Sequence, residues 1–284
     1  MRAQIALMLG IALSALAGVD PKAAAAADRR AQPMQFELLR EGPAEACGSR
    51  CGAWVTATGV MTEDTPHTFE HFAKQHDIRG AVIALDSSGG SVHGALLLGR
   101  AIRRLAMITT IGKTIDLPPQ SDGLKRAMLS PWTACESMCA FVLLAGIERH
   151  VPIEAQVLVH DIWPGGRRND PTGATYSADE LAIVQRDVVQ LARYTVEMGG
   201  TFALLEVALK VPPWKPMHQL SREELRAMKM ATIYDWPSES ASTLARQATP
   251  AIAPATALSP SMLHSSEGAG VKRQLGAPAD FMSD

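Results

Sequence analysis

A short apolar run that ends in a glycine pair and leads into a helical pattern constrains this fold more than any other feature. The run is Ala81–Leu85, and Asp86-Ser87-Ser88-Gly89-Gly90 follows it directly. Apolar runs of this length between turn residues are typical of strands buried on both faces of a parallel sheet. Residues 92–105 then repeat apolar side chains at helical spacing, namely Ala95, Leu98, Ala101, Ile102 and Leu105. The sequence therefore predicts a strand, a tight turn and a helix that returns across the sheet.

Strand and helix patterns alternate along most of the remaining chain. Strand patterns cover residues 53–60, 108–111 and 156–160, and helical patterns cover residues 65–76, 138–147, 179–198, 201–209 and 221–230. Ser221 and Glu224 have the spacing of a capping box at the start of the last helix. This alternation indicates βαβ crossovers, an α/β fold class and a mostly parallel sheet within one domain, residues 53–236.

The two ends of the chain differ in composition from this domain. Arg2 precedes the apolar run Ile5–Ala17, which predicts a cleavable secretory signal over residues 1–27 and a periplasmic or secreted protein. An uncleaved anchor is the alternative, although a membrane span needs about 20 apolar residues. We expect residues 28–52 to be a linker that carries a cysteine pair. Ser, Ala, Thr and Pro dominate residues 237–284, which predicts a disordered tail.

Charge and histidine spacing exclude several classes of partner. The net charge of −2 gives no basic surplus for binding nucleic acid or anionic lipid. His67, His71 and His76 lie in the helical pattern 65–76, where a solvated helix face explains them better than a metal site does. No other segment of the sequence has the spacing of metal ligands, so we expect neither a metal nor a cofactor.

Four cysteines are candidates for disulfide bonds in an exported protein. They are Cys47, Cys51, Cys135 and Cys139, and they allow three connectivities, among which the sequence does not choose. The first two lie in a Gly- and Ala-rich stretch that closes easily. The last two lie four positions apart at the start of a helical pattern, where they either form a bridge or are two small buried residues beside a turn.

Three segments carry groups suited to nucleophilic catalysis. The Gly89-Gly90 turn allows close approach of the backbone to a ligand and precedes a helix N-terminus, where N–H groups favour an anion. Ser137 opens an apolar helix, and His160 ends an apolar strand. A nucleophile needs a base within reach and donors aimed at the oxyanion, and these segments supply all three. Each also has a structural interpretation, namely an ordinary βα turn, an N-cap serine and a structural histidine.

The order of these segments resembles the ClpP peptidase family of the ClpP/crotonase superfamily. The matching motifs are DSSGGSV at 86–92, SM at 137–138, VLVH at 157–160 followed by Gly165-Gly166, and LSxxE at 220–224. The resemblance implies stacked βαβ units, with Ser137 as nucleophile and His160 as general base. It also implies oxyanion donors from Gly89 or Gly90 and from Met138. The helix at 179–198 matches a handle-type helix, through which copies of the chain would associate.

The chain departs from the family pattern in three places. Ser88 replaces a proline, and the insertion Thr114–Pro131 lies before Ser137, where it would act as a lid or fill the substrate groove. The third departure concerns the triad acid, which the family has shortly before its LSxxE segment. The corresponding stretch Val211–His218 contains no acid, and no replacement is favoured among Asp161, Asp170, Asp179 and Asp187.

These observations lead to two interpretations of function. The first is an exported serine hydrolase, a peptidase with a Ser137–His160 dyad or altered triad, which acts on peptide or protein substrates. The alternative is a catalytically inactive scaffold or binding protein of the periplasm. A Ser–Lys enzyme is disfavoured because no lysine occurs between Lys125 and Lys210. Neither acyl-CoA chemistry nor an ATPase partner is expected in an exported compartment.

Overall fold

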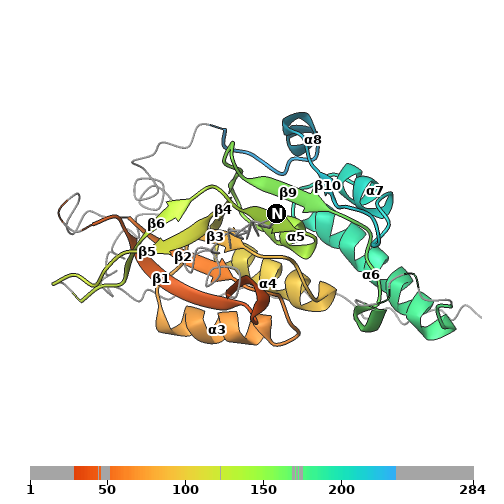
Figure 1. Ribbon diagram of the computed structural model, residues 1–284, viewed down its shortest axis with the longest axis horizontal. Coiled ribbons are helices and arrows are strands. Elements are labelled where there is room, and N and C mark those ends of the chain that lie inside the picture. Colours follow the sequence, from red (N-terminus) through yellow and green to blue (C-terminus); the bar gives the residue numbers. More distant parts are fainter. Residues whose placement is uncertain are drawn as a thin grey trace, which may run out of the picture. The chain divides into compact units, whose positions relative to one another are not determined.

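A sheet of seven strands, most of whose neighbours are parallel, forms the centre of the fold (Figure 1). The computed structural model describes residues 29–43, 45, 52–121, 123–167, 170, 172 and 175–234. The strand order is β5-β6-β1-β2-β3-β4-β8. Their bounds are β1 Gln35–Glu41, β2 Ala53–Thr58, β3 Val82–Asp86, β4 Ile108–Ile111, β5 Lys113–Asp116, β6 Arg126–Ser130 and β8 Arg149–His150. The chain is therefore of the mixed α/β class, as the strand and helix alternation predicts.

Parallel pairing joins β2, β3, β4 and β8, and also β6 and β1, whereas β1–β2 and β5–β6 are antiparallel. Side chains of the central strands alternate between two cores. Val55, Ile83 and Leu85 face the larger core, and Trp54 and Val82 face the smaller one on the opposite side of the sheet. This alternation fixes the register, because a shift by one residue would move each apolar side chain to the other face.

A second sheet of three strands carries both predicted catalytic residues at its strand ends. Its order is β10-β9-β7, with β7 Ala134–Glu136, β9 Gln156–Val159 and β10 His218–Gln219. β7 and β9 are parallel, so Ser137 and His160, which follow them, emerge at the same edge. A bridge between Ser87 and Cys135 joins this sheet to the end of β3. The glycine turn after β3 is thereby placed beside the serine.

Helices cover the face of the large sheet that bears the larger core. α3 (Thr65–Gln75) and α4 (Val92–Arg104) pack there with α5 (Met138–Leu143), as Figure 1 shows for the first two. The remaining helices are α6 (Ala178–Glu197), α7 (Ala203–Leu209), α8 (Arg222–Ala227) and the 3-10 turn η2 (Gly165–Arg167). Among the described residues, no helix combines the length and the apolar character needed to cross a bilayer.

Several segments differ from the expectations. The expected linker at 28–52 contains β1, which buries Phe36 in the larger core and Leu39 in the smaller one and pairs with β2. The insertion Thr114–Pro131 forms most of the β5–β6 hairpin at the edge of the large sheet, rather than a lid over the glycine turn. The helix expected at 138–147 ends at Leu143. The signal at 1–27, Cys47, Cys51 and the tail at 237–284 lie outside the described residues.

Candidate active site

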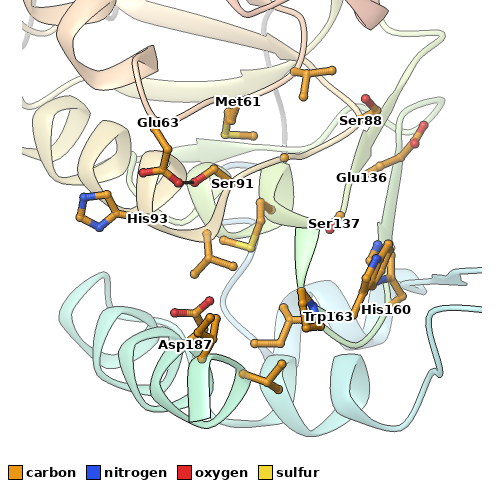
Figure 2. A pocket seen from close by; sticks show the side chains of 18 of the residues that line it. Met61, Glu63, Ser88, Ser91, His93, Glu136, Ser137, His160, Trp163 and Asp187 are labelled. Carbon is orange, nitrogen blue, oxygen red and sulfur yellow. Dashed lines mark hydrogen bonds between the residues drawn. The ribbon is translucent and has the colours of Figure 1, made fainter. Parts of the chain in front are cut away.

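Ser137 and His160 lie on the wall of one cavity of about 620 Å³ (Figure 2). The cavity lies between the glycine turn after β3, the β7–α5 turn, the loop after β9 and helix α6. Its apolar lining residues are Val60, Met61, Val92, Met138, Ile162, Trp163, Pro164, Ile183, Val184 and Met217. Its polar lining residues besides Ser137 and His160 are Glu63, Ser88, Ser91, His93, Glu136, Arg186 and Asp187. A cavity of this size with mostly apolar walls is typical of a site for a small or extended ligand.

The backbone at Ser137 has a conformation that residues other than glycine rarely adopt. Its φ is 53° and its ψ is −120°, in the sharp turn between β7 and α5. Strained backbone of this kind costs on the order of 1–3 kcal/mol and persists only where the surroundings impose it. A serine in a strained strand-to-helix turn is also how α/β hydrolases expose a nucleophile. The strain at Ser137 therefore makes this turn a candidate for a functional position.

The hydroxyl of Ser137 does not cap the helix that it precedes. α5 has no side-chain hydrogen bond at its N-cap, although Ser137 occupies that position. By contrast, Ser91, Ser177 and Ser221 each accept a backbone N–H as caps of their helices. The N-cap interpretation of Ser137 is therefore wrong, and its hydroxyl remains available to the cavity.

Backbone hydrogen bonds on both sides hold the serine turn in place. The N–H of Ser137 donates to the carbonyl of Leu158 in β9 at 2.8 Å. The N–H of Glu136 donates to the carbonyl of Ser87 at 3.0 Å. These two bonds link the turn to the strand that carries His160 and to the segment that carries the glycines.

A disulfide between Cys135 and Cys139 spans the same turn. Their Cα atoms are 5.2 Å apart, and both residues are fully buried. Of the two interpretations of this pair, the bridge is the one that is confirmed. One cysteine is in β7 and the other is in the first turn of α5, so the disulfide closes a small loop around Ser137.

A side chain at Gly89 or at Gly90 would collide with a different neighbouring segment. A Cβ on Gly89, whose φ is +92°, would lie 2.8 Å from Cβ of Ser137 and 3.0 Å from the nitrogen of Met138. A Cβ on Gly90, whose φ is +137°, would lie 2.1 Å from the carbonyl oxygen of Met61. The glycine turn therefore touches the serine turn directly, which a larger residue would prevent.

The expected oxyanion donors differ in their availability. The N–H of Gly89 donates to Oγ of Ser87 at 3.1 Å, so it is already engaged. Among the described residues, the N–H groups of Gly90 and Met138 have no hydrogen-bond acceptor, and both residues line the cavity. Gly90 and Met138 are therefore better placed than Gly89 to bind an oxyanion.

The ring of His160 is oriented by the main chain. Its Nδ1 lies 2.5 Å from the carbonyl oxygen of Asp161, and its ring stacks at 4.6 Å on the ring of Trp163. A carbonyl oxygen only accepts, so Nδ1 donates and Nε2 is the basic nitrogen. Burial lowers the pKa of His160, and the Asp161 carbonyl, the Asp161 carboxylate and Glu136 oppose that shift in part. The imidazole is therefore neutral near pH 7, as a general base requires.

No carboxylate in the described residues hydrogen-bonds to His160, and no hydrogen bond joins it to Ser137. Among the candidate acids, the carboxylate of Asp161 accepts from the N–H of Ile162, and its pKa is raised by burial. Asp170 and Asp179 are exposed, and Asp187 lines the cavity on α6. Catalytic hydrogen bonds are often long before substrate binds, so the Ser137–His160 separation does not exclude a dyad.

Sequence patterns did not identify Arg30, Glu136, Trp163 or Met217 as residues of the site. Glu136, Trp163 and Met217 line the cavity, and Arg30 binds Glu136. Glu136 could have been inferred from its position next to Ser137. Arg30 could not, since a single arginine far from the motifs carries no local pattern.

No protein-family model matches the sequence, and no curated protein matches it.

Proposed function

We propose that this protein is an exported serine hydrolase of ClpP/crotonase type, a peptidase with Ser137 as nucleophile and His160 as general base. The observation that carries the proposal is the strained turn at Ser137. The hydroxyl of Ser137 does not cap α5, and it lies in the same cavity as the neutral imidazole of His160.

The proposed mechanism follows from the positions of these groups. Nε2 of His160 takes the proton of Ser137 as Oγ attacks the carbonyl carbon of the substrate, which forms a tetrahedral oxyanion. The N–H groups of Gly90 and Met138 stabilise that oxyanion, and the bond to the leaving group breaks as His160 returns the proton to it. Water, deprotonated by His160, then attacks the acyl-enzyme, which releases the second product and restores the Ser137 hydroxyl. The carbonyl of Asp161 keeps Nδ1 protonated throughout, so the ring presents the correct nitrogen.

Labelling with a fluorophosphonate tests this proposal directly. The folded protein should be labelled at Ser137, as identified by mass spectrometry of its peptides. Ser137→Ala should abolish labelling, and His160→Asn should slow it by about 100-fold or more, the usual contribution of a general base. Ser130→Ala, on β6 outside the cavity, is the matched control and should be labelled like the unmodified protein. Absence of labelling at Ser137 in folded protein would exclude the hydrolase.

One observation favours the alternative function, an inactive scaffold or binding protein of the same fold. His160 has a main-chain carbonyl rather than a carboxylate on Nδ1, which gives weaker support to a charged ring. For a binding protein, peptides would bind in the cavity without reaction. Retention of a fluorescent peptide by folded protein that is not labelled at Ser137 would establish this alternative.

The resemblance further predicts self-association through the helix at 179–198. α6 buries only Leu191, Tyr194 and Thr195, while its exposed apolar residues include Leu181, Val189 and Val196 on one face. We propose that a second copy of the chain covers this face. Val189→Glu together with Val196→Glu should reduce the molecular mass measured by light scattering, whereas Gln75→Glu, at an exposed position of α3, should not.

A further inference from the structure

Arg30 reaches from the residues before β1 to the strand that carries the candidate nucleophile. Its Nη1 donates to Oδ1 of Asp86, to Oγ1 of Thr133 at 3.2 Å and to the carbonyl oxygen of Ala134 at 2.9 Å. Its Nη2 donates to Oε1 of Glu136 at 2.9 Å. One guanidinium thus binds four acceptors, which its forked, planar donors allow and a lysine could not reproduce.

Three of these acceptors belong to two different strands of the site, and Thr133 directly precedes one of them. Asp86 is the last residue of β3, directly before the glycine turn, and its side chain is only 3% exposed. Ala134 and Glu136 belong to β7, which ends at Ser137. Oγ1 of Thr133 also donates to Asp86, at 2.6 Å. Arg30 therefore joins the end of β3 to β7 at the two turns that form the candidate oxyanion site.

Glu136 also connects Arg30 electrostatically to His160. It lines the cavity, and its negative charge acts to raise the pKa of the imidazole. The other charged or titratable groups around His160 are Asp161 on its own loop, His218 with Glu224 beside β9, Arg186 with Asp187 across the cavity on α6, and Glu63 and His93 elsewhere in the cavity lining. Arg30 also binds Asp86, but of its two carboxylate partners only Glu136 shifts the pKa of His160, so we expect the effect of Arg30 on the imidazole to pass through Glu136.

We propose that Arg30 is a positioning residue of the Ser137–His160 site, which holds β7 against the end of β3 and offsets the charge of Glu136 beside the imidazole. The electrostatic part of this role does not depend on hydrolysis, because it can be measured on His160 itself. The positional part rests on the proposed function, because its effect is on the rate of labelling at Ser137.

The experiment is an NMR titration of His160 in the full chain, with its resonance assigned by its loss in His160→Asn. Arg30→Ala should raise the pKa of His160 by about 0.5 unit, because the negative charge of Glu136 is then no longer offset by the guanidinium. Glu136→Gln should lower that pKa. In the Glu136→Gln background, Arg30→Ala should leave the pKa nearly unchanged. An equal shift in both backgrounds would overturn the proposal, and so would a pKa unaffected by Glu136→Gln.

The variant Arg30→Lys separates the positional role of Arg30 from the effect of its charge. It also provides a test of the proposal if Arg30→Ala does not fold. Lysine keeps the charge near Glu136 but cannot bind all four acceptors. We expect an unchanged pKa of His160 and labelling of Ser137 slowed by about tenfold, as expected for a misplaced nucleophile. Unchanged labelling would overturn the positional role. If the unmodified protein is not labelled at all, the hydrolase proposal fails, while the titration still decides the link between Arg30 and His160.

Discussion

His160 donates its Nδ1 proton to the main-chain carbonyl oxygen of Asp161 across 2.5 Å. In a triad a carboxylate makes this contact and also stabilises the imidazolium that forms during attack. The carbonyl supplies the first effect, because it fixes the tautomer and the ring orientation. It supplies less of the second, because it carries no net charge. His160 is therefore an oriented base with weak support for its protonated form.

Met217→Asp should supply the missing charge. β9 and β10 are antiparallel with His218 opposite Val159, so continuing this register places residue 217 opposite His160. Met217 also lines the cavity. A carboxylate there should raise the pKa of His160 by about 1 unit and speed labelling of Ser137 by about tenfold. Met217→Asn is the neutral control of the same shape, and an equal gain from both variants would contradict the electrostatic explanation.

The labelling rate should fall on acidification with a midpoint below pH 6.5. Burial lowers the pKa of His160 below that ordinary value, and only the neutral ring accepts the proton of Ser137. The rate is therefore retained as pH falls to 6.5 and is lost at lower pH. A rate profile measured between pH 4.5 and pH 8 on protein shown to be folded by circular dichroism tests this. A midpoint above 6.5 would mean that another group controls the rate.

Gly89→Ala should disrupt the site more than its single methyl group suggests. The added Cβ would lie 2.8 Å from Cβ of Ser137, and φ at this position is +92°. Either the serine turn moves or the glycine turn does, and we expect labelling to fall by about 100-fold. Gly123→Ala is the matched control, since it also has positive φ but nothing lies within 4 Å of the added Cβ. Similar losses in both variants would show that backbone strain, and not the contact with Ser137, is responsible.

Removal of the disulfide should destabilise the fold and loosen the serine turn. The cysteines are four positions apart, and a loop of that length predicts a loss of about 2 kcal/mol in the free energy of unfolding. Urea unfolding of Cys135→Ala/Cys139→Ala measures this loss. We also expect slower labelling of the same variant when it is folded in the absence of urea. The strained φ of Ser137 is then less constrained. Labelling at the unmodified rate would show that the hydrogen bonds of the turn suffice.

Local patterns in the sequence predicted the helices and central strands, because each buries apolar residues at its own period. The helix expected at 92–105 is α4, Val92–Arg104, and the capping box of Ser221 and Glu224 is formed. β1 was not predicted, because its buried residues Phe36 and Leu39 are three positions apart and do not show the period of two that is typical of a strand. β7 was not predicted either, since three residues show no period and the strand exists through its pairing with β9.

The sequence motifs predicted the main residues of the candidate site, but not the groups that hold these residues in place. Ser137, His160 and the glycine turn follow from residue type and position, and their elements bring them to one cavity. The carbonyl of Asp161 has no sequence pattern, because every residue has a carbonyl group. Arg30 binds residues that are 56 and 106 positions away, so only the tertiary fold reveals its role.

His150 should make the protein less stable as the pH falls. Burial lowers its pKa from 6.5 to about 4, with a further contribution from the charge of Arg222, while Glu154 opposes the shift. Between these values the unfolded chain binds a proton that the folded chain does not, so stability is full above pH 6.5 and decreases toward pH 4. The loss should reach about 3 kcal/mol. Urea unfolding at pH 7 and at pH 4.5 measures it.

The variant His150→Asn should remove much of this acid sensitivity. Asparagine does not titrate, and its amide can replace Nδ1 as the partner of Thr110 Oγ1, which lies 3.1 Å from that nitrogen. We expect lower stability than the unmodified protein at pH 7, because the smaller side chain leaves a void, but a smaller difference between the two pH values. His67→Asn, on the exposed face of α3, is the control and should keep the full difference. If His150→Asn and the unmodified protein lose equal stability on acidification, groups other than His150 cause the loss, because removal of the imidazole had no effect on it.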